Sequence, residues 1–196
     1  MATRKRNQAA TSTVSRKQLR ESERAARQRQ KRLKTVAWAS AVTALVALVV
    51  VWAVIRAANQ PGQVVPDQGN LHIEPGQTSP IAYNSVPPTS GAHYESIANW
   101  GIHTELIPNE LQVHNLEDGG VGVWYDCPDG CPELVSQLEA VVRGYDEGVL
   151  LAPYPGLDSR IALTAWTRID KFDEFDRERI VRFIKAYRGR DHHVSR

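Results

Sequence analysis

The sequence predicts an α+β protein in which one transmembrane helix precedes one small extracytoplasmic α/β domain. Three observations support this prediction: an uncharged apolar stretch at residues 35–55, three later runs rich in β-branched and aromatic residues, and two amphipathic helical patterns interleaved with those runs. We expect a strand–helix–strand–strand–helix core beneath a loop-rich first half, with the domain at residues 69–190. A chain of 196 residues has room for one such domain and its attachments.

The apolar stretch at residues 35–55 contains no charge, proline or glycine. As a helix it would rise about 31 Å, which matches the hydrocarbon core of a bilayer. Trp38 and Trp52 lie near its ends, where indole rings favour the headgroup boundary. A cleaved signal peptide would have a shorter apolar run and a small residue, rather than Arg56, after it. The stretch therefore predicts an uncleaved membrane-spanning helix.

Charge is divided unevenly along the chain. Residues 1–34 carry 12 Lys and Arg and two acidic residues, whereas the remainder carries 12 basic and 20 acidic residues. Basic segments beside a transmembrane helix stay in the cytoplasm. The pattern predicts a single-pass protein of the cell membrane with a cytoplasmic tail at 1–34, a linker at 56–68, an extracytoplasmic domain, and a frayed tail at 191–196.

The basic tail is expected to contact anionic lipid headgroups as well as the bilayer itself, because each juxtamembrane Lys or Arg adds about 1 kcal/mol of attraction near the surface. Nucleic acid is not an expected partner, since no aromatic or groove-reading motif accompanies the charge.

The first half of the domain is expected to be largely irregular. Residues 71–73 and 111–115 are predicted to form short strands, and residues 116–120 a loop. Residues 86–93 (VPPTSGAH) cannot form a helix, because the paired prolines remove two backbone donors.

The second half shows clearer periodicity. Strands are predicted at 121–125, 149–152 and 161–166, and a helix at 132–144. A last helix is predicted to begin at Asp173 or Asp176 and to end at Tyr187. The residues expected to be buried on these helices are Leu134, Leu138, Val141, Phe175, Ile180, Phe183, Ile184 and Tyr187.

Four histidines lie in the loop-rich half: His72, His93, His103 and His114, with Glu117 and Asp118 shortly after the last. Imidazole and carboxylate ligands together suit zinc or copper. The alternative is that the histidines stiffen loops by hydrogen bonding and that Glu117 or Asp118 accepts local N–H bonds. The three tryptophans Trp100, Trp124 and Trp166 are expected in the core. His192 and His193 belong to the tail and are given no role.

Cys127 and Cys131 are the only cysteines, and both lie in the predicted extracytoplasmic domain. They fall between a predicted strand and a predicted helix, where a helix N-terminus stabilises a thiolate. A structural disulfide, a redox dithiol and a soft-metal site all fit. The oxidising location favours the disulfide.

The segment CPDGCPEL (127–134) resembles the Cys-Pro-x-x-Cys-Pro element of Sco-type copper chaperones. Those proteins are membrane-anchored and thioredoxin-like, and two cysteines with a distant histidine hold their copper. The resemblance implies a thioredoxin-like fold and a copper ligand role for Cys127 and Cys131.

A broader resemblance rests on a series of motifs in order: PDQGNLHI (66–73), YNSVPPTSGAHY (83–94), NWGIH (99–103), VHNLEDGGVGVWY (113–125), CPDGCPEL (127–134) and ALTAW (162–166). This series is similar to the bacterial family catalogued as domain of unknown function 3105, whose members are membrane-anchored. The family usually reads HNLEHGG, so Asp118 replaces a histidine here, and His103 stands where an aromatic residue is common. The resemblance implies that His93, His114 and Asp118 are the best metal ligands, with Asp118 weakening any preference for cuprous copper.

The expected function is a non-enzymatic binding or accessory module with a copper or zinc site. His93 and His114 would bind the metal with Asp118, His72, His103 or the cysteines. Two alternatives remain: a structural subunit of a membrane complex, such as a respiratory complex, and a thiol–disulfide oxidoreductase that uses Cys127 and Cys131. Hydrolysis is not expected, because no nucleophile–base arrangement is visible.

Overall fold

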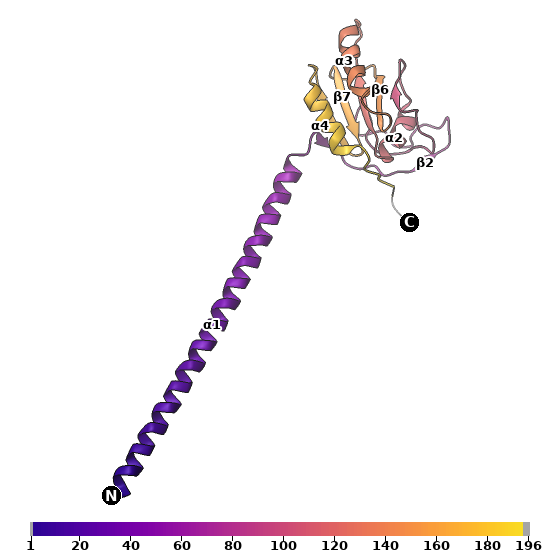
Figure 1. Ribbon diagram of the computed structural model, residues 1–196. Helices are drawn as coiled ribbons and strands as arrows, with labels where there is room; N and C mark the ends of the chain where they lie inside the picture. The colour runs from indigo at the N-terminus through magenta and orange to yellow at the C-terminus, as the bar shows by residue number, and fades with distance from the viewer. Residues whose placement is uncertain (1, 194–196) are drawn as a thin grey trace. The chain divides into compact units, whose positions relative to one another are not determined.

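The computed structural model describes residues 2–193, and the chain divides into two compact units, Met1–Asn59 and Gln60–Arg196. The first unit is a single helix, α1 (Ala2–Ala58), shown in Figure 1. The helix is uninterrupted because the first helix-breaking residues in the chain are Pro61 and Gly62. The first three residues of the segment predicted as a linker, 56–58, therefore belong to the helix.

The apolar part of α1 is exposed along its whole length. Every described side chain from residue 18 to residue 55 faces solvent. The segment Gln18–Ile55 is long and apolar enough to cross a membrane, a test of length and composition that an N-terminal signal sequence passes as well.

The second unit is an α+β fold built on a six-stranded mixed sheet with the order β1-β8-β7-β5-β6-β4. Strands β4, β5 and β6 are parallel, whereas β7, β8 and β1 follow by antiparallel pairing. The strands are β1 (Gln63–Val64), β4 (Gly101–Ile102), β5 (Val121–Tyr125), β6 (Val149–Pro153), β7 (Ile161–Ala165) and β8 (Arg168–Phe172). A separate parallel pair joins β2 (His72–Ile73) to β3 (His93–Tyr94).

Two helices, α3 (Pro132–Val142) and α4 (Arg177–Tyr187), share one face of the sheet (Figure 1). Their apolar residues form the main core with Val121 and Val123 of β5 and with neighbouring strand residues. Asp176 begins α4 by accepting a hydrogen bond from the backbone N–H of Arg179 at 2.9 Å. The predicted strands and helices of this half are present in their predicted order, with α3 ending two residues before its predicted end, but a further strand, β8, lies between β7 and α4.

The opposite face of the sheet is covered by the loop-rich half and by α2 (Asn109–Glu117). Trp124 of β5 is buried there, and its indole N–H donates to Thr164 Oγ1 at 2.7 Å. Trp166 packs against Val113 and Leu116 of α2, while Trp100 is only partly buried. Most of the histidines and carboxylates predicted as metal ligands lie on this face of the sheet.

Several elements differ from the sequence prediction, and the short strands β1, β3 and β4 were not predicted. The predicted strand at 111–115 is wrong, because these residues lie within α2. Strand β8 was not predicted, since its hairpin turn uses Thr167 in a left-handed conformation, with φ of 57°, in place of the Gly or Asn that signals such turns.

The predicted frayed tail is also corrected in part. His192 donates its backbone N–H to Glu117 O at 2.8 Å, so the start of this segment is held against α2. Residues 194–196 lie outside the described residues.

Candidate metal centre

Strands β2 and β3 and helix α2 bring three histidines and one glutamate together. The parallel register places His72 directly opposite His93, so that both side chains lie on the same side of the pair. His114 and Glu117 are three residues apart on α2 and therefore project from one face of the helix. The four residues thus come from three segments, β2, β3 and α2, that are distant from one another in the chain.

The potential ligand atoms of His72, His93, His114 and Glu117 all lie within 4.8 Å of one another. Glu117 Oε2 lies 3.0 Å from His93 Nε2 and 3.7 Å from His72 Nε2. The His114 ring centroid is 5.2 Å from that of His72 and 5.1 Å from that of His93. We call this set the inner group.

Hydrogen bonds to residues outside the inner group orient three of these side chains. Nδ1 of His93 lies 2.7 Å from Gly91 O, and Nδ1 of His114 lies 2.7 Å from Tyr94 O. Because a carbonyl oxygen only accepts, each Nδ1 carries a proton and directs Nε2 towards the group. The side chain of Asn70 donates to Glu117 Oε1 at 2.7 Å, which leaves Oε2 to face the histidines. Metal-binding side chains are typically held in this way by hydrogen bonds to residues that do not themselves bind the metal.

The electrostatics favour the metal-binding protonation states. Burial lowers the pKa of His93, against the raising effect of the Gly91 and Glu117 contacts. Burial by itself would raise the pKa of Glu117, but the Asn70 hydrogen bond and the nearby His93 and His193 outweigh it, so the pKa is lowered. A neutral imidazole and an ionised carboxylate are the forms that bind metal ions.

A second set, the outer group, consists of His114, Asp118 and His193, whose potential ligand atoms also lie within 4.8 Å of one another. Asp118 Oδ1 is 3.7 Å from both His114 Nε2 and His193 Nδ1. His193 Nε2 is 3.5 Å from Glu117 Oε2, which connects the two groups. Asp118 and His193 are partly exposed, unlike most of the inner group.

His192 and His193, which were predicted to lie in the frayed tail, instead contact the rest of the domain. His192 stacks on Trp166 with ring centroids 6.0 Å apart, and Trp166 in turn lies nearly perpendicular to the ring of His93. In the sequence, the only indication that the C-terminal segment contributes to the site was the pair of adjacent histidines. Their position depends on backbone hydrogen bonds to α2 that a sequence does not reveal.

The remaining predicted ligands lie apart from these groups. His103 Nε2 is 2.7 Å from Asn99 O, and among residues 2–193 neither group includes His103 or a cysteine. Glu117, which the sequence suggested only as one of two neighbouring carboxylates, instead lies at the centre of the inner group and is fully buried. The structure therefore brings together His72, His93, His114 and Asp118 of the predicted set.

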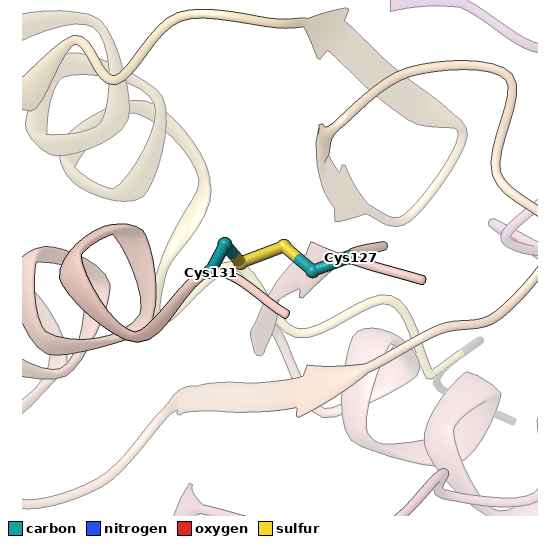
Figure 2. Close-up of a disulfide and its surroundings, with 2 residues drawn as sticks. All are labelled: Cys127 and Cys131. Atoms are coloured by element: carbon teal, nitrogen blue, oxygen red, sulfur yellow. A yellow bond between two sulfur atoms is a disulfide. The ribbon is translucent and has the colours of Figure 1, made fainter. Parts of the chain in front are cut away.

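Cys127 and Cys131 form a disulfide between the end of β5 and the start of α3, as Figure 2 shows. The histidine groups lie towards the opposite end of β5, since Glu117 and Asp118 precede this strand and the cysteines follow it. A pocket of 580 Å³ beside the disulfide is lined by residues that include Cys131, Pro132 and Arg160. The disulfide and the histidine groups are thus separate sites.

Two further pockets adjoin the histidine groups. One, of 610 Å³, is lined by His72, Glu74 and Glu95 among others. The other, of 510 Å³, is lined by residues that include Asp118, Gly119 and Asp191. Solvent therefore reaches the inner group from the side of His72 and the outer group from the side of Asp118.

Comparison with known proteins matches the chain to one family. The family described as "Protein of unknown function (DUF3105)" matches residues 72–195, a range that begins at His72 and includes every residue of both groups. No curated protein and no solved structure matches the chain. The chain belongs to the DUF3105 family.

Proposed function

We propose that this protein is a membrane-anchored metal-binding module that holds one Zn²⁺ or Cu²⁺ ion at His72, His93, His114 and Glu117. The observation that carries the proposal is the environment of His93. Its Nδ1 faces a carbonyl oxygen and its Nε2 faces a carboxylate oxygen, so both ring nitrogens face acceptors. A neutral imidazole has only one N–H to donate.

Burial of His93 disfavours the doubly protonated imidazolium that could satisfy both acceptors. With the proton on Nδ1, the Nε2 lone pair points at the Glu117 carboxylate. A cation between the two atoms converts this repulsion into two coordinate bonds. A metal ion therefore explains why the two acceptors face each other in a buried position.

The spacing of the inner group supports the same conclusion. Ligands about 2.0–2.1 Å from a tetrahedral zinc ion lie roughly 3.3 Å from one another. The distances from Glu117 Oε2 to His93 Nε2 and His72 Nε2, 3.0 and 3.7 Å, lie on either side of that value.

The ligand types restrict the metal. Imidazoles with one carboxylate suit Zn²⁺ and Cu²⁺, whereas cuprous copper prefers thiolates and thioethers. The two cysteines are joined to each other and lie at the other end of β5. Four protein ligands also favour a binding role, since catalytic zinc sites keep three protein ligands and an open position.

Membrane anchoring is supported by the exposed apolar segment of α1 and by the basic residues that precede it. In this proposal residues 1–34 are cytoplasmic and the metal centre is extracytoplasmic. The chain offers a direct test, since its only cysteines are Cys127 and Cys131. After mild reduction of intact cells, a membrane-impermeant maleimide should label the protein, whereas labelling only after lysis would contradict the topology.

Metal binding is tested on the full-length protein, purified in mild detergent without chelator. Elemental analysis should find zinc or copper, which a chelator removes and which returns on addition of either ion. His72→Ala removes a ligand from an exposed position and should lower the affinity. His103→Ala, a histidine outside both groups, is the matched control and should bind metal as the native chain does.

A second candidate function is thiol–disulfide exchange at Cys127 and Cys131. The disulfide is partly exposed at the N-terminus of α3 beside a pocket, and α3 and α4 share one face of the sheet, as expected for a thioredoxin-like arrangement. The Sco-like CPDGCPEL motif fits the same proposal. A measured reduction potential below about −300 mV would mark a structural disulfide and exclude this function.

A further inference from the structure

We propose that His114, Asp118 and His193 form a loading position, where the metal ion first binds before it moves into the inner group. The inference rests on the proposed function, since it describes the route by which the same ion reaches that site. It assigns a role to Asp118 and to the C-terminal segment, neither of which the inner group requires.

The two groups share His114, and this residue cannot serve two ions at once. Its Nδ1 is committed to Tyr94 O at 2.7 Å, so only Nε2 remains to bind metal. The inner and outer positions are therefore alternatives for one ion rather than a two-metal centre. The predicted stoichiometry is one ion per chain.

Exposure gives the two positions an order. The side chains of Asp118 and His193 are 33% and 41% exposed, whereas in the inner group those of His93 and Glu117 are fully buried and His72, at 41%, is the exposed member. The pocket beside the outer group is lined by the carboxylates of Asp118, Glu147 and Asp191 and by one cation, Arg188, so the charge of its lining is negative and attracts a metal ion. An ion that arrives from this side meets the outer group first.

The geometry allows transfer by exchange of one ligand at a time. Glu117 Oε2 is 3.5 Å from His193 Nε2 and 3.0 Å from His93 Nε2. An ion held by His114 and His193 therefore has Glu117 within reach before it releases His193. His114 stays bound throughout, so the ion is never without ligands.

The C-terminal segment is built to present His193. Asp191 Oδ1 accepts from the His193 backbone N–H at 2.8 Å and lies 2.7 Å from its Nδ1, so Nδ1 is committed to Asp191 and Nε2, which lies 3.5 Å from Glu117 Oε2, remains to bind a metal ion. Gly189 N–H donates to Gly119 O at 2.8 Å. A Cβ at Gly119 would lie 2.6 Å from Arg190 N, so the close approach of the segment to α2 requires glycine there.

The pocket beside His72 is the competing route, and its lining includes Glu74 and Glu95. The chain thus supplies a matched control. Asp118→Ala and His193→Ala remove the loading position, whereas the double variant Glu74→Gln/Glu95→Gln weakens the attraction of the other pocket for a cation. His103→Ala controls for the loss of a histidine elsewhere.

The experiment uses full-length protein in detergent, stripped with chelator and mixed rapidly with Cu²⁺, whose binding near Trp166 quenches tryptophan fluorescence. Rates of uptake and of release to excess chelator are measured together with the stoichiometry and the equilibrium dissociation constant. In Asp118→Ala and His193→Ala, both rates should fall together, at least about tenfold, because each variant removes a ligand of the position where the cation first binds. The dissociation constant should change much less than either rate, because every ligand of the inner group is retained.

Several results would overturn the inference while leaving the proposed function standing. Faster release with a weaker dissociation constant would make His193 a ligand of the final site. Unchanged or faster uptake, two ions per native chain, or slow uptake confined to the Glu74→Gln/Glu95→Gln variant would each exclude the loading position. A native chain that binds no Cu²⁺ or Zn²⁺ would instead remove the proposed function and this inference with it.

Discussion

Nε2 of His93 lies 3.0 Å from Oε2 of Glu117, and neither side chain is exposed to solvent. The histidine comes from a buried loop and strand β3, and the glutamate from the last turn of α2. A buried carboxylate costs free energy unless it is paired and hydrogen-bonded. Here Asn70 satisfies one oxygen, and the other faces the group that we assign to the metal.

Replacement of Glu117 by glutamine keeps the size of the side chain and removes its charge. We expect the affinity for Zn²⁺ or Cu²⁺ to fall by more than about 100-fold. Loss of a residue that only hydrogen-bonds a metal ligand already lowers metal affinity by about 10–100-fold. Competition with a chelator of known affinity measures the change. Affinity equal to that of the native chain would show that Glu117 is not a ligand.

Asn70 tests the orientation of Glu117 separately from its charge. Asn70→Ala removes the 2.7 Å hydrogen bond to Glu117 Oε1 and leaves every proposed ligand in place. The same competition assay should show an affinity about 10–100-fold weaker, with the stoichiometry unchanged. An affinity that matches the His103→Ala control would argue against this role.

The metal-free protein should lose stability as the pH falls below about 6.5, the ordinary value for histidine. Burial lowers the pKa of His93 and of His192 in the folded state, so the unfolded chain binds protons first and is favoured in acid. The pKa of His193, raised by its hydrogen bond to Asp191, acts in the opposite direction, but this side chain is largely solvent-screened.

Thermal unfolding of chelator-treated protein between pH 7.5 and 5 measures this dependence. His93→Gln should flatten the curve, because it removes one of the two groups that take up a proton on unfolding. A midpoint that rises towards pH 5 in the native chain would contradict the assignment of a neutral, buried His93.

Asn115 joins the loop-rich half to α2. Its side chain accepts from Ala98 N–H and donates to Ala98 O, both at 2.9 Å and both buried. Asn115→Ala should reduce the free energy of unfolding by about 2–4 kcal/mol, because two buried backbone groups lose their partners. Chemical denaturation with and without metal measures the loss. A change below about 0.5 kcal/mol, the size expected of an ordinary surface substitution, would contradict this role of Asn115.

The sequence predicted the half of the fold in which local patterns agree with the tertiary structure. Helices α3 and α4 each bury one apolar stripe against the sheet, so their periodicity is visible in the residues alone. Helix α2 was predicted as a strand because every residue from Gln112 to Glu117 is buried, polar ones included, which removes the contrast between an apolar and a polar face.

The same helix explains what the sequence could and could not say about the site. His72, His93, His114 and Asp118 were predictable from the residue types that bind metals. The central place of Glu117 was not, because the predicted loop at 116–120 gave it no fixed relation to His114. In α2 the two residues lie one turn apart. His193 was beyond prediction, since its position depends on contacts of the C-terminal segment with Gly119 and Glu117.

The metal content of the full-length protein tests the central proposal most directly. Protein purified in mild detergent without chelator is analysed for all first-row transition metals, before and after reconstitution, beside the His103→Ala and Glu117→Gln variants. We predict one zinc or copper ion per chain in the native protein and in His103→Ala, and loss of that ion in Glu117→Gln. A folded native chain that holds no metal, even after reconstitution with Zn²⁺ and Cu²⁺, would contradict the account.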